Sequence, residues 1–219
     1  MTDPNRTSTG GDLFIVSAPS GTGKNTLIRE VLEAFGEEGG LVYSVSYTTR
    51  SPREGEVDGE NYHFVDQEVF DKMVGDGAFL EWAEYNSNHY GTAAAEVLPR
   101  LEAGIDVILE IEVRGTEKLL ERCPDGHAIF LLPPSHEALH RRIVNRGIDT
   151  PEEIAQRLNV AQWEIECYGL YHYVIINDNL KRASQALAAI ILEKRHRVAR
   201  QEGRIEEVLQ GFRKIGPES

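Results

Sequence analysis

Cysteines and long apolar segments are scarce in this chain of 219 residues. It contains two cysteines, Cys123 and Cys167, and neither they nor the seven histidines show metal-ligand spacing, so we expect no metal site built from them and no structural disulfide. The chain lacks an apolar run long enough to cross a bilayer, and its first ten residues are polar. These features predict a cytoplasmic protein without a signal peptide or a membrane partner.

Positive charge is scarce as well. The chain has 23 lysines and arginines against 36 acidic residues, which gives a net charge of -13. Such a balance argues against a nucleic-acid partner or an anionic membrane surface. If the ligands are phosphates, the few basic side chains must be gathered locally.

Four short and almost continuous apolar segments alternate with helical patterns. They are residues 13–16, 107–111, 128–132 and 173–176. This pattern is typical of parallel strands covered on both faces, so the sequence predicts an α/β fold in a chain long enough for one domain with appendages.

The segment from Leu13 to Thr26, LFIVSAPSGTGKNT, carries the clearest motif. An apolar strand leads into a turn with Gly21 and Gly23 and then into Lys24 at the start of a helix. Glycines let the backbone approach an anion, the helix N-terminus favours negative charge, and the lysine adds a cation for the β- and γ-phosphates. We therefore predict an ATP site formed by Ala18, Pro19, Ser20, Gly21, Thr22, Gly23, Lys24, Asn25 and Thr26.

This motif departs from the usual G-x-x-x-x-G-K-[ST] pattern at two positions. Ala18 replaces the first glycine, and Asn25 replaces the hydroxyl residue that normally touches Mg²⁺. The carboxamide oxygen of Asn25 is a hard, neutral donor that can substitute for that hydroxyl, and the neighbouring Thr26 is a second candidate.

Other signals place further elements. A helix is expected to open near Ser135 with Leu139 and Ile143 inward, and another after Thr150, which forms a capping box with Glu153. Residues 44–95 alternate in short segments punctuated by glycine and proline, which predicts an inserted, mainly β subdomain. From residue 180 we expect a long amphipathic helix, followed by a charged tail over residues 205–219.

Two arginines lie close together in the segment SYTTRSPREGEVDGENYHFV, which spans residues 46–65. Arg50 and Arg53 can clamp a phosphate with their guanidinium groups, and Tyr62 follows shortly. An arginine pair in a loop is usually only solvated, but its place after a phosphate-binding motif in an acidic chain favours a second phosphate site.

With this segment the chain resembles the guanylate kinases. The resemblance extends over residues 12–200 and rests on SAPSGTGK, SYTTRSPREGEVDGENYHFV, FLEWAEYNSNHYGT, LPPS, RRIVNRG and VIINDNL. It implies the fold of the P-loop nucleoside monophosphate kinases in a single domain, with a core over residues 12–43, 96–136 and 169–204. It also implies a GMP-binding subdomain at 44–95 and a helical lid at 137–168.

The resemblance further implies which residues bind GMP. They are Ser46, Arg50, Arg53, Tyr62, Glu81, Tyr90, Thr92 and Glu112. The assignment of Glu81 agrees with the chemistry of guanine, which presents N1-H and N2-H₂ as adjacent donors to a carboxylate, whereas adenine would present an acceptor. An unpaired buried polar group costs about 1 to 3 kcal/mol, so Glu81 can select the base.

An acidic pair, usually two aspartates, faces the metal and the guanine amino group in this family. The matching residues here are Glu110 and Glu112, which alternation would place on one face of a strand. Each is one methylene longer than aspartate. The implied ligands of Mg²⁺ are therefore Asn25 and Glu110, and Glu112 is assigned to GMP.

The reaction that follows is the Mg²⁺-dependent transfer of the γ-phosphoryl group from ATP to GMP, and to dGMP. The acceptor is already an anion, so catalysis needs positioning and charge neutralisation rather than a strong base. The predicted catalytic residues are Lys24, Arg50, Arg142, Arg146 and Arg157, and the resemblance implies that the last three belong to a lid that closes over the ATP phosphates.

Two alternatives remain open from the residues. One is a binding module of the same fold that holds a phosphorylated partner without catalysis, which Asn25 mildly favours and Lys24 disfavours. The other is a kinase of a sugar phosphate, which has no use for a guanine-reading Glu81. A homo-oligomer is possible under each of these hypotheses.

Overall fold

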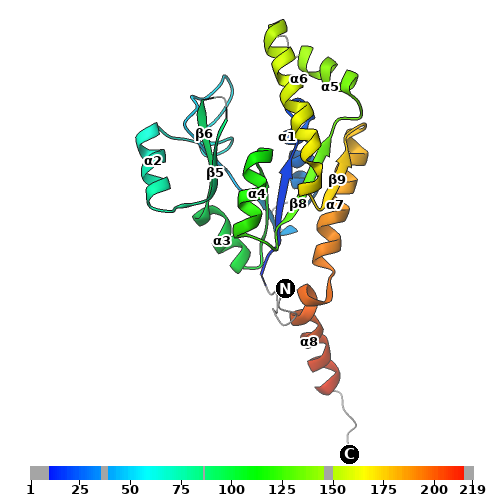
Figure 1. Cartoon of the computed structure of the whole chain (residues 1–219). Coiled ribbons are helices and arrows are strands. Elements are labelled where there is room, and N and C mark those ends of the chain that lie inside the picture. Colours follow the sequence, from blue (N-terminus) through cyan, green and yellow to red (C-terminus); the bar gives the residue numbers. More distant parts are fainter. Residues whose placement is uncertain (1–9, 36–38, 86, 146–149, 215–219) are drawn as a thin grey trace, which may run out of the picture.

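The structure is a computed structural model that describes residues 10–35, 39–85, 87–145 and 150–214 (Figure 1). Within these ranges the central element is a five-stranded parallel sheet with the order β2-β7-β1-β8-β9. Its strands are β1 (Leu13–Ser17), β2 (Leu41–Tyr43), β7 (Asp106–Glu110), β8 (His127–Leu132) and β9 (Tyr173–Ile176). The sequence predicts all of them except the edge strand β2, which is too short to show a periodic pattern.

Helices cover both faces of this sheet. On one face lie α1 (Lys24–Phe35) and α7 (Leu180–Arg195), and on the other α3 (Ala94–Glu102) and α4 (Val113–Arg122). Side chains alternate along β1, so that Phe14 and Val16 pack with α1 and α7 while Ile15 packs with α3 and α4. All three are fully buried. The predicted α/β core is therefore present.

A second sheet lies to one side of the core (Figure 1). Its strands β3 (Tyr47–Thr48), β4 (His63–Phe64), β5 (Phe79–Tyr85) and β6 (Asn88–Ala93) follow the order β4-β3-β6-β5. The helix α2 (Gln67–Gly75) packs on it through Phe70, whose ring is 4.7 Å from that of Phe79. Antiparallel pairing of β5 with β6 places Glu81 opposite Thr92. These elements all fall within the segment for which the sequence predicts an inserted subdomain.

Two helices stand at the end of the sheet where the strands finish (Figure 1). They are α5 (His136–Val144) and α6 (Pro151–Glu166), and the short 3-10 helix η2 (Cys167–Leu170) follows. The helix predicted to open near Ser135 is present, with Ser135 Oγ accepting from the amide of Ala138, and the predicted capping box of Thr150 and Glu153 is confirmed. Leu139 is buried between the two helices, as predicted. These elements occupy the segment predicted to be a lid.

The C-terminal segment, for which a charged tail from residue 205 is predicted, is helical as far as the described residues extend. The helix α8 (Val198–Lys214) continues past residue 205 and extends away from the other elements (Figure 1). Near its start Arg200 pairs with Asp106 at 2.8 Å and with Asp12 at 3.1 Å. These ion pairs join α8 to the first residue of β7 and to the residue before β1. The prediction of a tail missed this helix, although Ile205, Val208, Leu209 and Phe212 recur at helical spacing. No helix in the described ranges is long and apolar enough to span a membrane.

Candidate active site

The phosphate loop, residues 18–23, joins the end of β1 to the first residue of α1. Gly21 and Gly23 have φ angles of 90° and 96°, which residues with a side chain rarely adopt. The amide of Thr22 donates to the carbonyl of Pro19 at 3.1 Å and closes the turn. The predicted ATP-binding residues, from Ala18 to Thr26, all lie on this loop or in the first turn of α1.

Two side chains from distant segments hold the phosphate loop. The carbonyl oxygen of Thr22 accepts from Nη1 of Arg142 at 2.9 Å and from Nδ2 of Asn177 at 2.8 Å. Nη2 of Arg142 also donates to the carbonyl of Asn177 at 2.8 Å. Arg142, which the sequence predicts to act on ATP phosphates, therefore contacts the backbone of the loop predicted to hold them.

Lys24 is the buried cation of the site. Its Nζ lies 3.3 Å from Oε1 of Glu110. Burial disfavours the charge of Lys24, but the carboxylates of Glu110 and Glu112 outweigh burial and raise the pKa of Lys24 above its usual value. The lysine therefore keeps its charge at neutral pH, at the end of the phosphate loop.

The two predicted acids do not lie on one strand. Glu110 is the last residue of β7, whereas Glu112 is the N-cap of α4, because the chain leaves the sheet between them. Alternation along a strand was therefore the wrong argument for their common orientation. Both side chains nevertheless line the same pocket.

The predicted metal ligands, Asn25 and Glu110, lie side by side. With its amide nitrogen toward Glu110, Asn25 donates to Oε2 at 3.1 Å and to Oε1 at 3.3 Å. Mg²⁺ takes oxygen ligands, commonly one or two carboxylates together with substrate phosphates, so this pair fits the ion. The described residues contain no group of three acidic, histidine or cysteine side chains that would hold a metal alone. Nucleotide phosphates and water would supply the remaining ligands.

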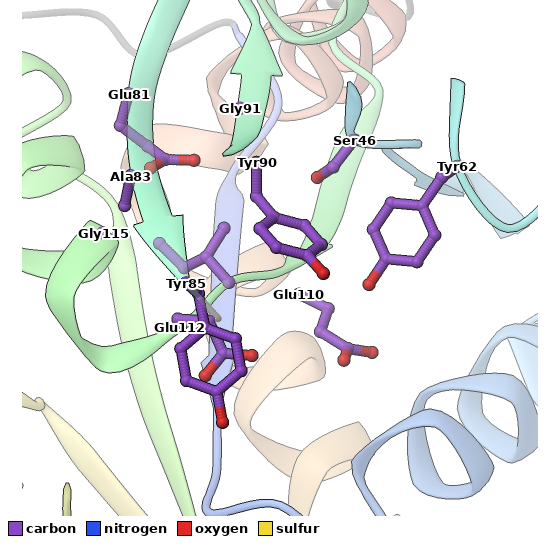
Figure 2. A pocket seen from close by; sticks show the side chains of 11 residues that line it. Ser46, Tyr62, Glu81, Ala83, Tyr85, Tyr90, Gly91, Glu110, Glu112 and Gly115 are labelled. Atoms are coloured by element: carbon purple, nitrogen blue, oxygen red, sulfur yellow. The ribbon is translucent and has the colours of Figure 1, made fainter. Parts of the chain in front are cut away.

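Next to Glu110 opens a pocket between the two sheets, shown in Figure 2. Of the residues predicted to bind GMP, it is lined by Ser46, Tyr62, Glu81, Tyr90 and Glu112. In Figure 2 the Tyr62 hydroxyl and the Glu110 carboxylate approach the same space from different segments. Glu110 thus connects this pocket with Lys24 and the phosphate loop.

Glu81 is the carboxylate at the far end of the pocket. It is 7 % exposed, and its Oε1 accepts a hydrogen bond of 2.8 Å from the hydroxyl of Thr92, which is itself fully buried. Burial raises the pKa of Glu81 to about 7, although the Thr92 bond and the charge of Lys118 act in the opposite direction. Thr92 therefore orients Glu81 but does not itself line the pocket.

Arg50 does not reach into the pocket in this structure. Its guanidinium forms two bonds of 2.9 Å to the carboxylate of Glu56 and lies over the rings of Tyr62 and Phe64. Glu56 also accepts from the backbone amide of Arg53 at 2.7 Å, while the Arg53 side chain is exposed. Glu56 therefore holds the two predicted phosphate-binding residues in one loop.

The helix α6, in the segment predicted to be a lid, contacts α4 beside the pocket. Trp163 lies under the guanidinium of Arg114 at 5.2 Å. The neighbouring Glu164 is 3 % exposed, and burial together with the charge of Glu112 raises its pKa to about 8. Arg157 lies half-buried on the same helix, whereas Arg146 falls outside the described residues.

The family of the chain follows from its comparison with known proteins. The guanylate kinase family matches residues 11–194. The chain belongs to the guanylate kinase family. A guanylate kinase of Alkalilimnicola ehrlichii is 45 % identical over 200 residues, covering 91 % of this chain and 97 % of the relative. A guanylate kinase of Syntrophotalea carbinolica is 46 % identical over 190 residues, covering 87 % and 89 %.

A solved structure supports the same conclusion. The crystal structure of guanylate kinase from Anaplasma phagocytophilum superposes with a TM-score of 0.73 at 31 % identity, covering 87 % of this chain and 89 % of that one. The predicted fold of the P-loop nucleoside monophosphate kinases is confirmed. So is the enzyme class, a nucleoside monophosphate kinase that transfers phosphate from ATP to GMP. A kinase of sugar phosphates is thereby set aside.

Several residues of the site were not predicted. The pocket is also lined by Ala83, Tyr85, Gly91, Ile111 and Gly115. Alternation along β5 with Glu81 would have identified Ala83 and Tyr85, because side chains two residues apart share a face. Gly115 carries no such signal, since a single glycine in a helical pattern gives no indication of what lies beside it.

Proposed function

We propose that this guanylate kinase aligns ATP and GMP across Glu110, with the guanine at Glu81 and the ATP phosphates on the loop that ends at Lys24. The observation that supports it is the continuous path from Lys24 through Glu110 into the pocket that Glu81 lines. In this proposal the ionised Glu81 accepts from guanine N1-H and N2-H₂. Ser46 and Glu112 line the same pocket and complete the recognition of the base.

The GMP phosphate is assigned to the loop that carries Arg50 and Arg53. Arg50 is held by Glu56 and lies over Tyr62, so a small change in its direction would bring it to a phosphate near the Tyr62 and Tyr90 hydroxyls. Guanidinium forks suit phosphate oxygens because they donate two parallel hydrogen bonds.

The transfer itself needs little acid-base chemistry. The attacking GMP oxygen is already anionic, so Lys24 and the lid arginines Arg142, Arg146 and Arg157 act by neutralising charge around the transferred group. Asn25 and Glu110 would hold Mg²⁺, which supplies further positive charge at the phosphates. Arg142 in addition fixes the loop backbone through the Thr22 carbonyl.

Water is a competing acceptor, so the helices α5 and α6 and the smaller sheet are assigned the roles of a lid and a GMP-binding subdomain that close on their substrates. Small-angle scattering with a bisubstrate analogue tests this closure. A radius of gyration that decreases on binding supports it, and an unchanged radius contradicts it.

A coupled assay with ATP and Mg²⁺ tests the substrate assignment. The acceptors are GMP, dGMP, AMP, UMP and ribose phosphates, and we expect turnover of GMP and dGMP alone. Equal rates with AMP would contradict a guanine-reading carboxylate at position 81. Binding of GMP without any turnover would instead favour the non-catalytic binding module.

A further inference from the structure

Gly115 lies against the carboxylate of Glu81. It is a buried residue in the first turn of α4 and lines the pocket with Glu81 (Figure 2). A β-carbon at this position would lie 2.6 Å from Oε2 and 3.2 Å from Cδ of Glu81. Such a carbon cannot approach an oxygen to 2.6 Å, so any side chain here must displace either Glu81 or α4.

Glu81 has little freedom to move away. Its Oε1 is held by the Thr92 hydroxyl at 2.8 Å, and the backbones of these two residues are paired across β5 and β6. Both side chains are buried. Rotating the carboxylate away from α4 would break the bond to Thr92, whose hydroxyl is fully buried.

The helix α4 is fixed as well. Near its start the Thr116 hydroxyl bonds to the buried hydroxyl of Ser17, on β1, at 2.9 Å. At its end Arg122 bonds to the carbonyl oxygen of Phe79, on the same strand as Glu81. A shift of α4 would disturb these contacts at both ends.

The backbone does not explain the glycine. Gly115 is not among the glycines with a positive φ in the described part of the chain. It lies within a regular helix, where alanine is the more stabilising residue. Considered as a helix position alone, Gly115→Ala should therefore stabilise the protein. The space taken by Glu81 is the feature that opposes a side chain here.

We propose that Gly115 is a specificity-determining positioning residue: its lack of a side chain lets the Glu81 carboxylate rest against α4, with Oε1 on Thr92 and Oε2 beside the space for guanine. The first turn of a helix also favours a neighbouring negative charge, which suits an ionised Glu81. This inference rests on the proposed role of Glu81 as the group that reads guanine.

The test is Gly115→Ala in the full-length enzyme. We expect kcat/KM for GMP to fall by about 10- to 100-fold, the effect of losing hydrogen bonds to a charged group, with KM for ATP within about twofold of the wild type. IMP lacks the 2-amino group and makes fewer of these bonds, so the preference for GMP over IMP should fall too. The matched control is Gly203→Ala in α8, where the added carbon meets nothing within 4 Å apart from its chain neighbours and the helix's own backbone, and its kinetics should be those of the wild type.

A double-mutant cycle separates positioning from general damage. Aspartate is one methylene shorter and withdraws the carboxylate from α4, so in a Glu81→Asp background the Gly115→Ala change should alter kcat/KM for GMP by less than about threefold. If Gly115→Ala alone does not fold, the double variant is expected to regain folding. If Gly115→Ala lowers kcat/KM for GMP as much in that background as in the wild type, the proposal is overturned. It is also overturned if the double variant is unfolded.

Two further outcomes separate a failure of the role proposed for Gly115 from a failure of the role proposed for Glu81. If Glu81→Gln impairs GMP turnover and Gly115→Ala does not, Gly115 has no positioning role while Glu81 still reads guanine. If Glu81→Gln itself leaves the GMP over IMP preference unchanged, the proposed role of Glu81 is wrong and the role of Gly115 is lost with it.

Discussion

The phosphate loop and the pocket proposed to hold guanine are built in opposite ways. The loop is one continuous segment, and its shape depends on the φ angles of Gly21 and Gly23 and on the helix that follows. The pocket is assembled from both sheets and α4, and its key carboxylate, Glu81, is oriented by Thr92 and faces Gly115. Backbone geometry is encoded locally, whereas a side-chain pocket depends on contacts between segments far apart in the sequence.

The largest effect is expected at the loop, from Lys24→Met. Methionine keeps the volume but removes the charge at the phosphates, so kcat should fall by about 10³-fold in a coupled assay. The variant also leaves Glu110 without its cation, which should lower the free energy of unfolding by about 3 kcal/mol in urea denaturation. Adding Glu110→Gln should restore stability but not activity. Recovery of both would show that Lys24 acts only on Glu110.

This contrast explains which features of the structure could be predicted from the sequence and which could not. The loop, the core strands other than β2 and the Thr150 capping box could all be predicted, because each signal lies within a few consecutive residues. The bonds of Arg142 to the Thr22 carbonyl and of Thr92 to Glu81 could not, since they join segments whose approach is decided by packing. The expectation that Glu110 and Glu112 share a strand is wrong because β7 ends at Glu110 and Glu112 is already the N-cap of α4.

Binding of GMP in the pocket should depend on pH, whereas binding at the phosphate loop should not. With the pKa of Glu81 at about 7, the ionised fraction that accepts guanine donors falls about 30-fold between pH 8 and pH 5.5, and GMP affinity should fall with it. Calorimetric titration of GMP over this range measures the effect. Because the phosphate of GMP also titrates near pH 6, Glu81→Gln is the control. If GMP affinity depends on pH equally in both proteins, the assignment of Glu81 is contradicted.

The same titration has a consequence for stability. Because the folded-state pKa of Glu81 lies above its ordinary value of 4.5, the folded protein binds the proton more tightly than the unfolded chain. Stability from this group is complete below about pH 4.5 and is lost as pH rises through 7, by about 3 kcal/mol in all. Glu81→Gln should remove that pH dependence from urea denaturation curves.

A smaller effect is expected where the loop depends on a distant side chain. Arg142→Ala removes the bonds to the carbonyls of Thr22 and Asn177, so the loop loses a support that its own sequence does not supply. We expect KM for ATP to rise by about 10-fold and KM for GMP to stay within twofold, measured by initial rates. A matched rise in both constants would mean that Arg142 supports the whole molecule instead.

The smallest effect is expected at Asn25, where the loop departs from the usual motif. Asn25→Ser places a hydroxyl beside Glu110 in place of the carboxamide and removes the contacts at 3.1 and 3.3 Å to that carboxylate. Both groups offer a hard oxygen, so kcat at saturating Mg²⁺ should change little, while the Mg²⁺ concentration for half-maximal rate should shift by about two- to fivefold. Thr26→Ala is the matched control, because Thr26 is the other exposed candidate ligand on the same turn. A shift with Thr26→Ala and none with Asn25→Ser would move the metal contact to Thr26 and limit the role of Asn25 to its contact with Glu110.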